Sequence, residues 1–227
     1  MIRPEKLQEI QEAIDYFKVV EDKIIDEPPS YIDVRVHEFT LNCGLEVRRE
    51  EVIKGKGNNS RASVIIPVTE DGTVILTIQS KPFIDRTVGL DFAGGLVDKE
   101  EDFETAAHRE LREETGLSCS RGLIRLGSYY TEDTLGPSFN TGFLALDCKR
   151  GEQKLDSGEF IRLVEVTVDE LFELGEMGYI KGGGSQFLLL SAKPYIYEFL
   201  KRKSNVDYSE TIDDNVYSGI KLRWDIF

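Results

Sequence analysis

The sequence predicts an α/β domain with a mixed sheet, and three observations carry that prediction. Segments in which apolar and polar residues alternate, as they do in strands, recur between residues 31 and 168. A run with helical spacing lies among them at 103–111, and a longer helical run begins at 185, after the last strand. Strands on both sides of an embedded helix indicate one sheet with helices packed against it.

Length and composition indicate one main domain with additions. The chain has 227 residues, of which 40% are hydrophobic, and this is enough to bury one sizeable core. We expect an N-terminal helix and β region at 1–60, the main domain at 61–203 and a C-terminal segment at 204–227. The last segment has more aromatic residues than a disordered tail usually has, so we expect it to dock on the domain or on a partner subunit.

The charge balance is strongly acidic, with a formal net charge of −14 and a sequence pI of about 4.7. It offers no basic surface to nucleic acid or to an anionic membrane, and an anionic substrate would need metal ions to bind. No run approaches the ~20 apolar residues that span a bilayer. Cys43, Cys119 and Cys148 lack the spacing of a disulfide framework or a metal site, so we expect a cytoplasmic protein with reduced cysteines.

Two kinds of element precede the main domain. Residues 2–24 have an amphipathic pattern that predicts a helix, which Pro28 and Pro29 should end. Residues 31–53 alternate in the manner of strands around a turn at 42–44, and they predict an antiparallel pair. The polar stretch 54–60 is expected to be the loop that leads into the main domain.

The main domain should begin with a β-hairpin, because two apolar segments at 62–69 and 73–79 flank an Asp71-Gly72 turn. Thr167 is a candidate cap for a short helix, and Pro194 should bend the terminal one. The remaining elements that we expect are a loop at 81–86, strands at 88–92, 123–130, 141–148 and 160–168, and helices at 169–177 and 185–202.

The stretch 95–117 has the strongest pattern in the chain. A Gly94-Gly95 turn should lead into a helix whose apolar positions include Ala107 and Leu111, and Gly116 is a typical helix stop. Three carboxylates on this helix, those of Glu110, Glu113 and Glu114, are three or four residues apart and share one face. Like charges this close repel one another unless a cation lies among them, and carboxylate oxygens suit Mg²⁺ or Mn²⁺.

The same stretch contains the full Nudix box, and the chain therefore resembles the Nudix hydrolases. The residues that carry the resemblance are Gly95, Glu101, Arg109, Glu110, Glu113, Glu114 and Gly116, with apolar Leu111 and Leu117. The resemblance implies an α/β/α sandwich with the box helix packed on the sheet. It also implies a metal-dependent hydrolase that cleaves a nucleoside diphosphate linked to another group, by attack of water on phosphorus.

Roles for individual residues follow from their places in the motif. The resemblance makes Glu110 and Glu114 direct metal ligands and Glu113 a ligand or a group that holds the catalytic water. The backbone carbonyl of Gly94 is expected to coordinate metal as well. Three further residues, Glu101, Arg109 and Gly95, should support the site, the first two as an ion pair that fixes the loop against the helix.

The general base is expected outside the box. In the ADP-ribose pyrophosphatase branch a glutamate in a loop before a late strand activates the water, and Glu159 occupies that place here. Asp156 and Glu152 are close enough in sequence to compete for the role. A loop that is acidic only because the protein is acidic remains an alternative.

Beyond the box, the chain is most similar to the ADP-ribose and nucleoside-diphosphate-sugar pyrophosphatases, which release a nucleoside monophosphate and a sugar phosphate. That branch has an N-terminal β region used in dimer formation, so residues 1–60 are a candidate dimerisation arm and a homodimer is expected. Lys81, Asp91 and Ala93 stand where the branch has Arg, Glu and Pro. Candidate substrate contacts are Lys81, Asp91, Phe92 and Tyr130, and the aromatic rings that could stack on a base are Phe83, Phe92, Tyr129 and Tyr130.

Other functions stay open at the level of sequence. The segment from Ile75 to Phe92 partly resembles the signature of coenzyme A pyrophosphatases. Nucleoside-triphosphate pyrophosphohydrolases share the box as well. A non-catalytic nucleotide-sensing module is the alternative from a different class, although such a module has no need of three intact box glutamates.

Overall fold

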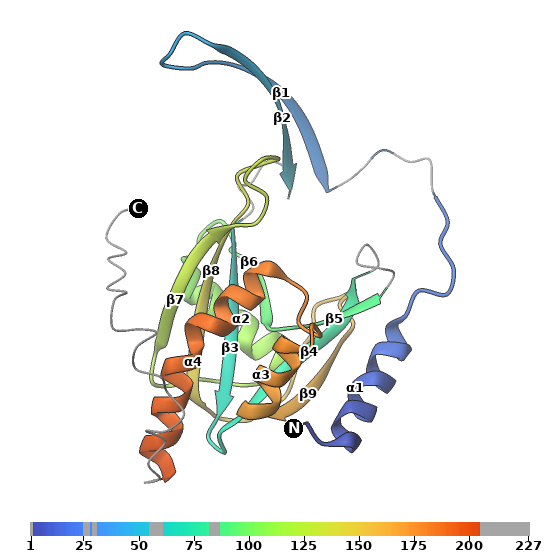
Figure 1. Cartoon of the computed structure of the whole chain (residues 1–227), viewed down its shortest axis with the longest axis vertical. Helices are drawn as coiled ribbons and strands as arrows, with labels where there is room; N and C mark the ends of the chain where they lie inside the picture. Colours follow the sequence, from blue (N-terminus) through green and yellow to red (C-terminus); the bar gives the residue numbers. More distant parts are fainter. Residues whose placement is uncertain (1, 25–27, 29–30, 55–60, 82–86, 205–227) are drawn as a thin grey trace.

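The computed structural model describes residues 2–24, 28, 31–54, 61–81 and 87–204, and it confirms an α/β fold with a mixed sheet. Figure 1 shows a layered domain from which a two-stranded hairpin projects. The predicted loops at 54–60 and 81–86 fall almost wholly outside the described residues, as does the expected docking of 204–227. None of the helices in the described ranges is long and apolar enough to cross a membrane.

The helices and strands follow the predicted order, with one additional strand, β6. The helices are α1 (Pro4–Phe17), α2 (Phe103–Thr115), α3 (Val168–Glu176) and α4 (Gly183–Ser204). The strands are β1 (Ile32–Thr40), β2 (Glu46–Lys54), β3 (Arg61–Thr69), β4 (Thr73–Lys81), β5 (Thr87–Asp91), β6 (Ala93–Leu96), β7 (Leu123–Tyr130), β8 (Phe139–Cys148) and β9 (Ile161–Thr167).

The sheet of the main domain has the order β5-β4-β3-β8-β7, with β6 paired to β3 and β9 paired to β4. Among the strand pairs of the described residues, β3 and β8 run parallel and the others are antiparallel, which makes the sheet mixed. The parallel pair is the centre of the domain, because β3 contacts β8 along almost its whole length.

The two strands predicted at 62–69 and 73–79 are confirmed as β3 and β4, but they pair with each other as a hairpin only next to the turn, so the predicted pairing along their length was wrong. Gly72 has the expected left-handed backbone (φ +82°), yet the strands pair only where Val68 faces Val74. Beyond that point β3 and β4 separate. The chain through β5 and β6 fills the split, since β5 pairs with β4 and β6 pairs with β3.

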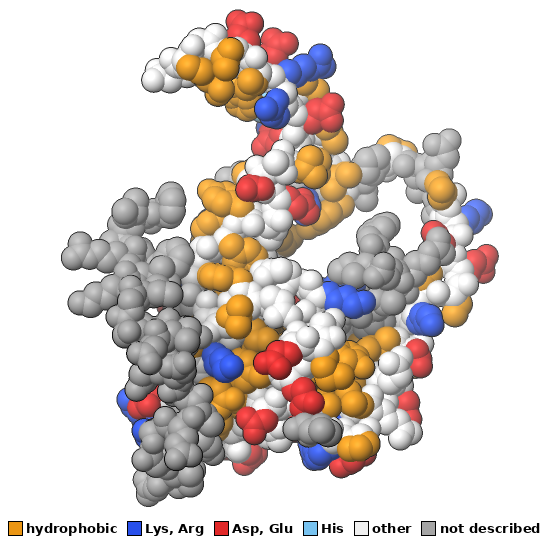
Figure 2. Space-filling view, viewed as in Figure 1, with side chains coloured by type: hydrophobic (Ala, Val, Ile, Leu, Met, Phe, Trp, Pro, Cys, Tyr) orange, Lys and Arg blue, Asp and Glu red, His pale blue; other side chains and the backbone are white. Residues whose placement is uncertain are grey.

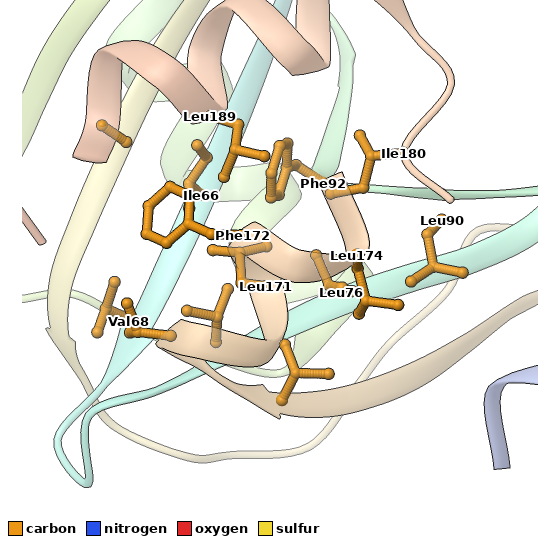
Figure 3. Packing of buried hydrophobic residues seen from close by; sticks show 14 of the residues in the cluster. Ile66, Val68, Leu76, Leu90, Phe92, Leu171, Phe172, Leu174, Ile180 and Leu189 are labelled. Atoms are coloured by element: carbon orange, nitrogen blue, oxygen red, sulfur yellow. The ribbon is translucent and has the colours of Figure 1, made fainter. Parts of the chain in front are cut away.

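Two apolar clusters lie on opposite faces of the sheet and give the α/β/α layering. One cluster receives α1, α3 and α4, and Figure 3 shows Leu171, Leu174 and Leu189 packed over strand residues of that face. The other receives α2, whose Ala107 and Leu111 are fully buried against the sheet. The predicted position of the box helix on the sheet is therefore confirmed.

Helix α1 is shorter than the predicted 2–24. It ends at Phe17, and the Val20 and Ile24 side chains beyond it are 98% and 93% exposed. An amphipathic helix is stabilised mainly by packing of its apolar face, and no such packing is available past Phe17.

The start of α1 is attached to α3 by an ion pair. The Arg3 guanidinium donates to both Glu170 carboxylate oxygens (2.7 and 3.0 Å), and this contact lowers the pKa of Glu170 to about 2.

The helices after β9 agree with the sequence more closely. Thr167 caps α3, and together with Glu170 it forms a reciprocal capping box. Helix α4 begins two residues before the predicted start and contains Pro194 within its length. The cap of α3 could thus be predicted from the local sequence, whereas the exact start of α4 could not.

The hairpin of β1 and β2 has a regular antiparallel register but few contacts with the domain. Val34, Val36 and Phe39 are each about half exposed, and Figure 2 shows hydrophobic side chains gathered on this hairpin. It meets the loop after β7 where Val52 N donates to Leu135 O (2.6 Å) and Lys54 pairs with Glu132 (2.9 Å).

Candidate active site

Helix α2 is defined at both ends by its own sequence. The Asp102 carboxylate accepts a hydrogen bond from Thr105 N (2.7 Å), and Gly116 adopts the left-handed conformation (φ +71°) that ends the helix. Ala107 and Leu111 anchor one face to the sheet. The carboxylates of Glu110 and Glu114 are consequently held at the boundary between the helix and β6.

Gly94 and Gly95 do not form the predicted turn, because they lie within β6 and pair with β3. These two positions require glycine because a side chain would not fit there. A Cβ on Gly95 would stand 2.2 Å from Glu110 Oε1, and a Cβ on Gly94 would stand 2.4 Å from Ser63 O. The two glycines therefore allow β6 to approach both the helix and β3, and the chain turns only after Leu96.

Glu110 and Glu114 are buried acids, with 7% and 3% of their surfaces exposed. Gly94 N donates to Glu114 Oε2 (2.8 Å). Burial raises the pKa of both carboxyls, that of Glu114 to about 8, and the charges of Glu159 and Asp91 add to the effect on Glu114. At neutral pH Glu114 therefore favours its protonated form when nothing positive lies next to it.

Arg109 connects the acidic groups. Its Nε and Nη2 each donate to the Glu101 carboxylate at 3.0 Å, so the structure contains the expected ion pair, which lowers the pKa of Glu101. Nη2 also donates to Leu96 O (2.9 Å). Nη1 donates to Glu110 (2.8 Å) and to the more exposed Glu113 (3.0 Å), so one guanidinium bridges three carboxylates.

This arrangement fits a divalent cation by the chemistry of its donors, although they do not yet form a coordination shell. Among the described residues, no three His, Cys, Asp or Glu side chains are grouped as a metal site. The reason is visible at Glu110 and Glu113, which share Arg109 Nη1. Buried carboxylates with raised pKa values are hard oxygen donors that lack a full counter-charge, and a divalent ion supplies one.

The loop 149–160 brings Glu159 to the same place. Lys154 N donates to Glu113 O (2.9 Å) and the Gln153 side chain donates to Glu114 O (2.6 Å), which fastens the loop to the end of α2. Glu159 is exposed, and its charge raises the pKa of both Glu110 and Glu114. Asp156 N donates to Glu159 Oε2 (3.0 Å), so Asp156 contacts Glu159 through its backbone.

Asp91 is a junction between three elements. It accepts hydrogen bonds from Lys81 on β4 and from Ser185 Oγ on α4 (2.5 Å), and its other contact is with Phe92 N (2.9 Å). The structure thus places two predicted residues, Lys81 and Asp91, together. Ser185 was not predicted as a site residue, because the sequence indicated only that the terminal helix begins there.

Phe92 is a correction to the predicted substrate contacts. Only 3% of it is exposed, and Figure 3 shows its ring in the core near Leu189 and Ile180. Tyr130 is 58% exposed and remains accessible. Tyr129 is half-buried, with its pKa raised by burial, and Phe83 lies outside the described residues.

An open cavity lies beside the Asp91 junction. Its volume is about 680 Å³, and Lys81, Tyr129, Tyr130 and residues 182–185 line it. Three aromatic rings, counting that of Phe187, together with one ammonium group and glycine backbone suit a polar ligand that also carries a flat ring.

Known proteins resemble this chain in sequence and in fold. A family model described as NUDIX domain matches residues 59–182. The ADP-ribose pyrophosphatase of Bacillus subtilis (strain 168) is 30% identical over 165 residues, which cover 70% of this chain and 85% of that protein. The methanol dehydrogenase activator of Bacillus methanolicus is 26% identical over 166 residues, covering 69% and 84%. A crystal structure of an ADP compounds hydrolase shares the fold, with a TM-score of 0.65 at 21% identity, covering 79% of this chain and 92% of that one.

Replacing Glu114 with Gln tests whether the buried carboxylates bind a cation. In the metal-free protein Glu114 has a pKa of about 8, so binding of Mg²⁺ at pH 7 should displace its proton. Calorimetry in buffers of different ionisation enthalpy should show proton release of about one per ion, diminishing as the pH rises past 8. Glu114→Gln should abolish the release and weaken binding by more than about tenfold.

The matched control is Glu104→Gln, on the exposed side of the same helix, which should leave binding and proton release unchanged. Equal Mg²⁺ affinity in the Glu114→Gln and wild-type proteins would remove Glu114 from the site.

Proposed function

This chain belongs to the NUDIX domain family and is a Nudix pyrophosphohydrolase, and from that premise we propose that it hydrolyses ADP-ribose or a related nucleotide sugar. The products would be a nucleoside monophosphate and a sugar phosphate. The observation that carries the proposal is that the charge of Glu159 acts on the buried Glu110 and Glu114 carboxylates and helps to raise their pKa. The similarity to the ADP-ribose pyrophosphatase of Bacillus subtilis supports this choice of substrate.

Nudix hydrolases generally use divalent metal ions, and we assign Mg²⁺ or Mn²⁺ to this site. Glu110 and Glu114 would hold the ion, with Glu113 and the carbonyl of Gly94 as further oxygen ligands. A bound cation would neutralise charge on the diphosphate and make a nearby water more acidic. Burial of Glu110 and Glu114 supports the assignment, because a cation favours the ionised form that burial disfavours.

Within this site the protein's own residues orient the reactants and move one proton. Glu159 would accept a proton from water as the water oxygen attacks phosphorus, and the bond between that phosphorus and the bridging oxygen then breaks. Arg109, fixed by Glu101, would keep the box carboxylates in place. The Glu113 carboxylate remains partly exposed although it pairs with Arg109, and a group that holds a water molecule must be accessible in this way.

The cavity beside Asp91 is our candidate for the rest of the substrate. Lys81 would contact phosphate or ribose oxygens as a point charge, and it is itself held by Asp91. Tyr130 offers an exposed ring on which a base can stack. These contacts replace the contribution first expected from Phe92.

A substrate panel tests the proposal. ADP-ribose, UDP- and GDP-sugars, coenzyme A and nucleoside triphosphates would be compared with Mg²⁺ or Mn²⁺ by release of a nucleoside monophosphate. We expect the highest kcat/KM for ADP-ribose or another nucleotide sugar and no turnover without metal. Preference for coenzyme A or a triphosphate would overturn the substrate assignment while leaving the hydrolase class intact.

Glu159→Gln tests the general base. Removing the proton acceptor should lower kcat by about 10²–10⁴-fold. Mg²⁺ affinity should stay near the wild-type value, because the box carboxylates are untouched. Glu152→Gln, in the same loop, is the matched control and should keep normal turnover; if it alone is slow, the base is Glu152.

We also propose that residues 1–60 serve as a dimerisation arm. The support is the projecting β1–β2 hairpin, on which Val34, Val36 and Phe39 are half exposed. Apolar side chains arranged this way gain free energy when a second surface covers them. Sedimentation equilibrium of the full chain should give a dimer and Phe39→Glu should shift it toward monomer, whereas a wild-type monomer at micromolar concentration would refute the arm.

A further inference from the structure

The chain segment that follows α2 runs beside the end of β8. Ser118 N donates to Lys149 O and Lys149 N donates to Ser118 O, both at 2.9 Å, so these two residues form an antiparallel bridge. The next pair along the bridge is Cys119 and Cys148. In an antiparallel ladder the pair next to such a doubly bonded pair is a non-hydrogen-bonded pair, with Cα atoms about 4.5 Å apart.

Side-chain contacts agree with this register. Both cysteines are free thiols, and both pack in the cluster between α2 and the sheet. Cys119 Sγ donates to Leu146 O (3.2 Å), Cys148 Sγ donates to Ala145 O (3.5 Å), and the Cys119 thiol contributes to the raised pKa of Cys148. Disulfides in proteins join cysteines whose Cα atoms are about 4.4–6.8 Å apart, so this pair needs little backbone movement to be joined.

We infer that Cys119 and Cys148 are an oxidisable pair that a hydroperoxide converts into an intramolecular disulfide. In the first step the Cys119 thiolate attacks the peroxide, an S–O bond forms, and the O–O bond breaks. The leaving hydroxide takes up a proton, which leaves Cys119 as a sulfenic acid. In the second step the Cys148 sulfur attacks the Cys119 sulfur, an S–S bond forms, and the hydroxyl leaves as water with the Cys148 proton.

The two cysteines have different roles in the two reaction steps. Cys148 is fully buried, and burial raises the pKa of its thiol to about 12. Cys119 is partly exposed, so it is the sulfur that a dissolved oxidant can reach. Cys148 acts second, from within the protein. Cys43 is exposed in the turn between β1 and β2 and belongs to neither step.

The bond would join two segments that already meet at the site. One follows directly after Gly116, and the other precedes the loop 149–160. The disulfide closes a loop of about 30 residues, which restricts the unfolded chain and should raise Tm by about 5–10 °C. Neither the inference nor its readouts depend on the substrate that the enzyme hydrolyses.

The experiment uses the full chain with Cys43→Ser, which removes intermolecular coupling and leaves the core unchanged. After treatment with hydrogen peroxide and alkylation of remaining thiols, trypsin should yield peptides 113–121 and 126–149 joined to each other. The expected rise in Tm should disappear when dithiothreitol is added. Recovery of the two peptides unlinked, with Cys148 alkylated after denaturation, would overturn the inference.

A second variant tests the order of the steps. With Cys148→Ser, the sulfenic acid on Cys119 has no partner and should be trapped quantitatively by dimedone, whereas the parent protein should show only transient trapping. Dimedone labelling on neither cysteine in this variant would contradict a first step at Cys119. The peptide map of the Cys43→Ser protein remains decisive if this variant does not fold.

Discussion

The close contact between α2 and β6 is the constraint on which the site depends. It exists because Gly94 and Gly95 present bare backbone, and the Glu110 carboxylate occupies the space that a Gly95 side chain would need. The same contact brings Gly94 N to Glu114. Burial of two acids follows from it, and so does their raised pKa, which makes the site receptive to a cation.

Arg109 gives this acidic site an internal counter-charge. In a chain of net charge −14, one guanidinium spans Glu101, Glu110 and Glu113 while also bonding to Leu96 O. A cation bound by the proposed box ligands would compete with two of these bonds and would leave the bonds to Glu101 in place. Arg109 would keep its own position in that case, because Glu101 and Leu96 O hold it independently of Glu110 and Glu113.

Local features of the fold could be predicted from sequence, and long-range pairing could not. The end of α2 at Gly116, the Thr167 cap and the Glu101–Arg109 pair depend on residues close in the chain. By contrast, the hairpin at Asp71-Gly72 divides because β6 pairs with β3 and β5 pairs with β4 at the edges where the two strands would have met. The distant strands β8 and β9 take the other edges of β3 and β4, and no local pattern encodes these pairings. Phe92 faces the core and Ser185 meets Asp91 for the same reason, since both contacts join distant segments.

The attachment of the loop 149–160 to α2 affects how the loop is placed against the sheet. The carbonyls that hold the loop, those of Glu113 and Glu114, belong to the residues whose carboxylates form the site. Gln153 and Lys154 attach the loop to the helix, and Glu159 lies two residues before β9 of the sheet. The bonds that join α2 to the sheet, from Gly94 N to Glu114, from Arg109 to Leu96 O and from Ser63 Oγ to Phe103 O, therefore also fix the position of the loop 149–160 relative to the sheet.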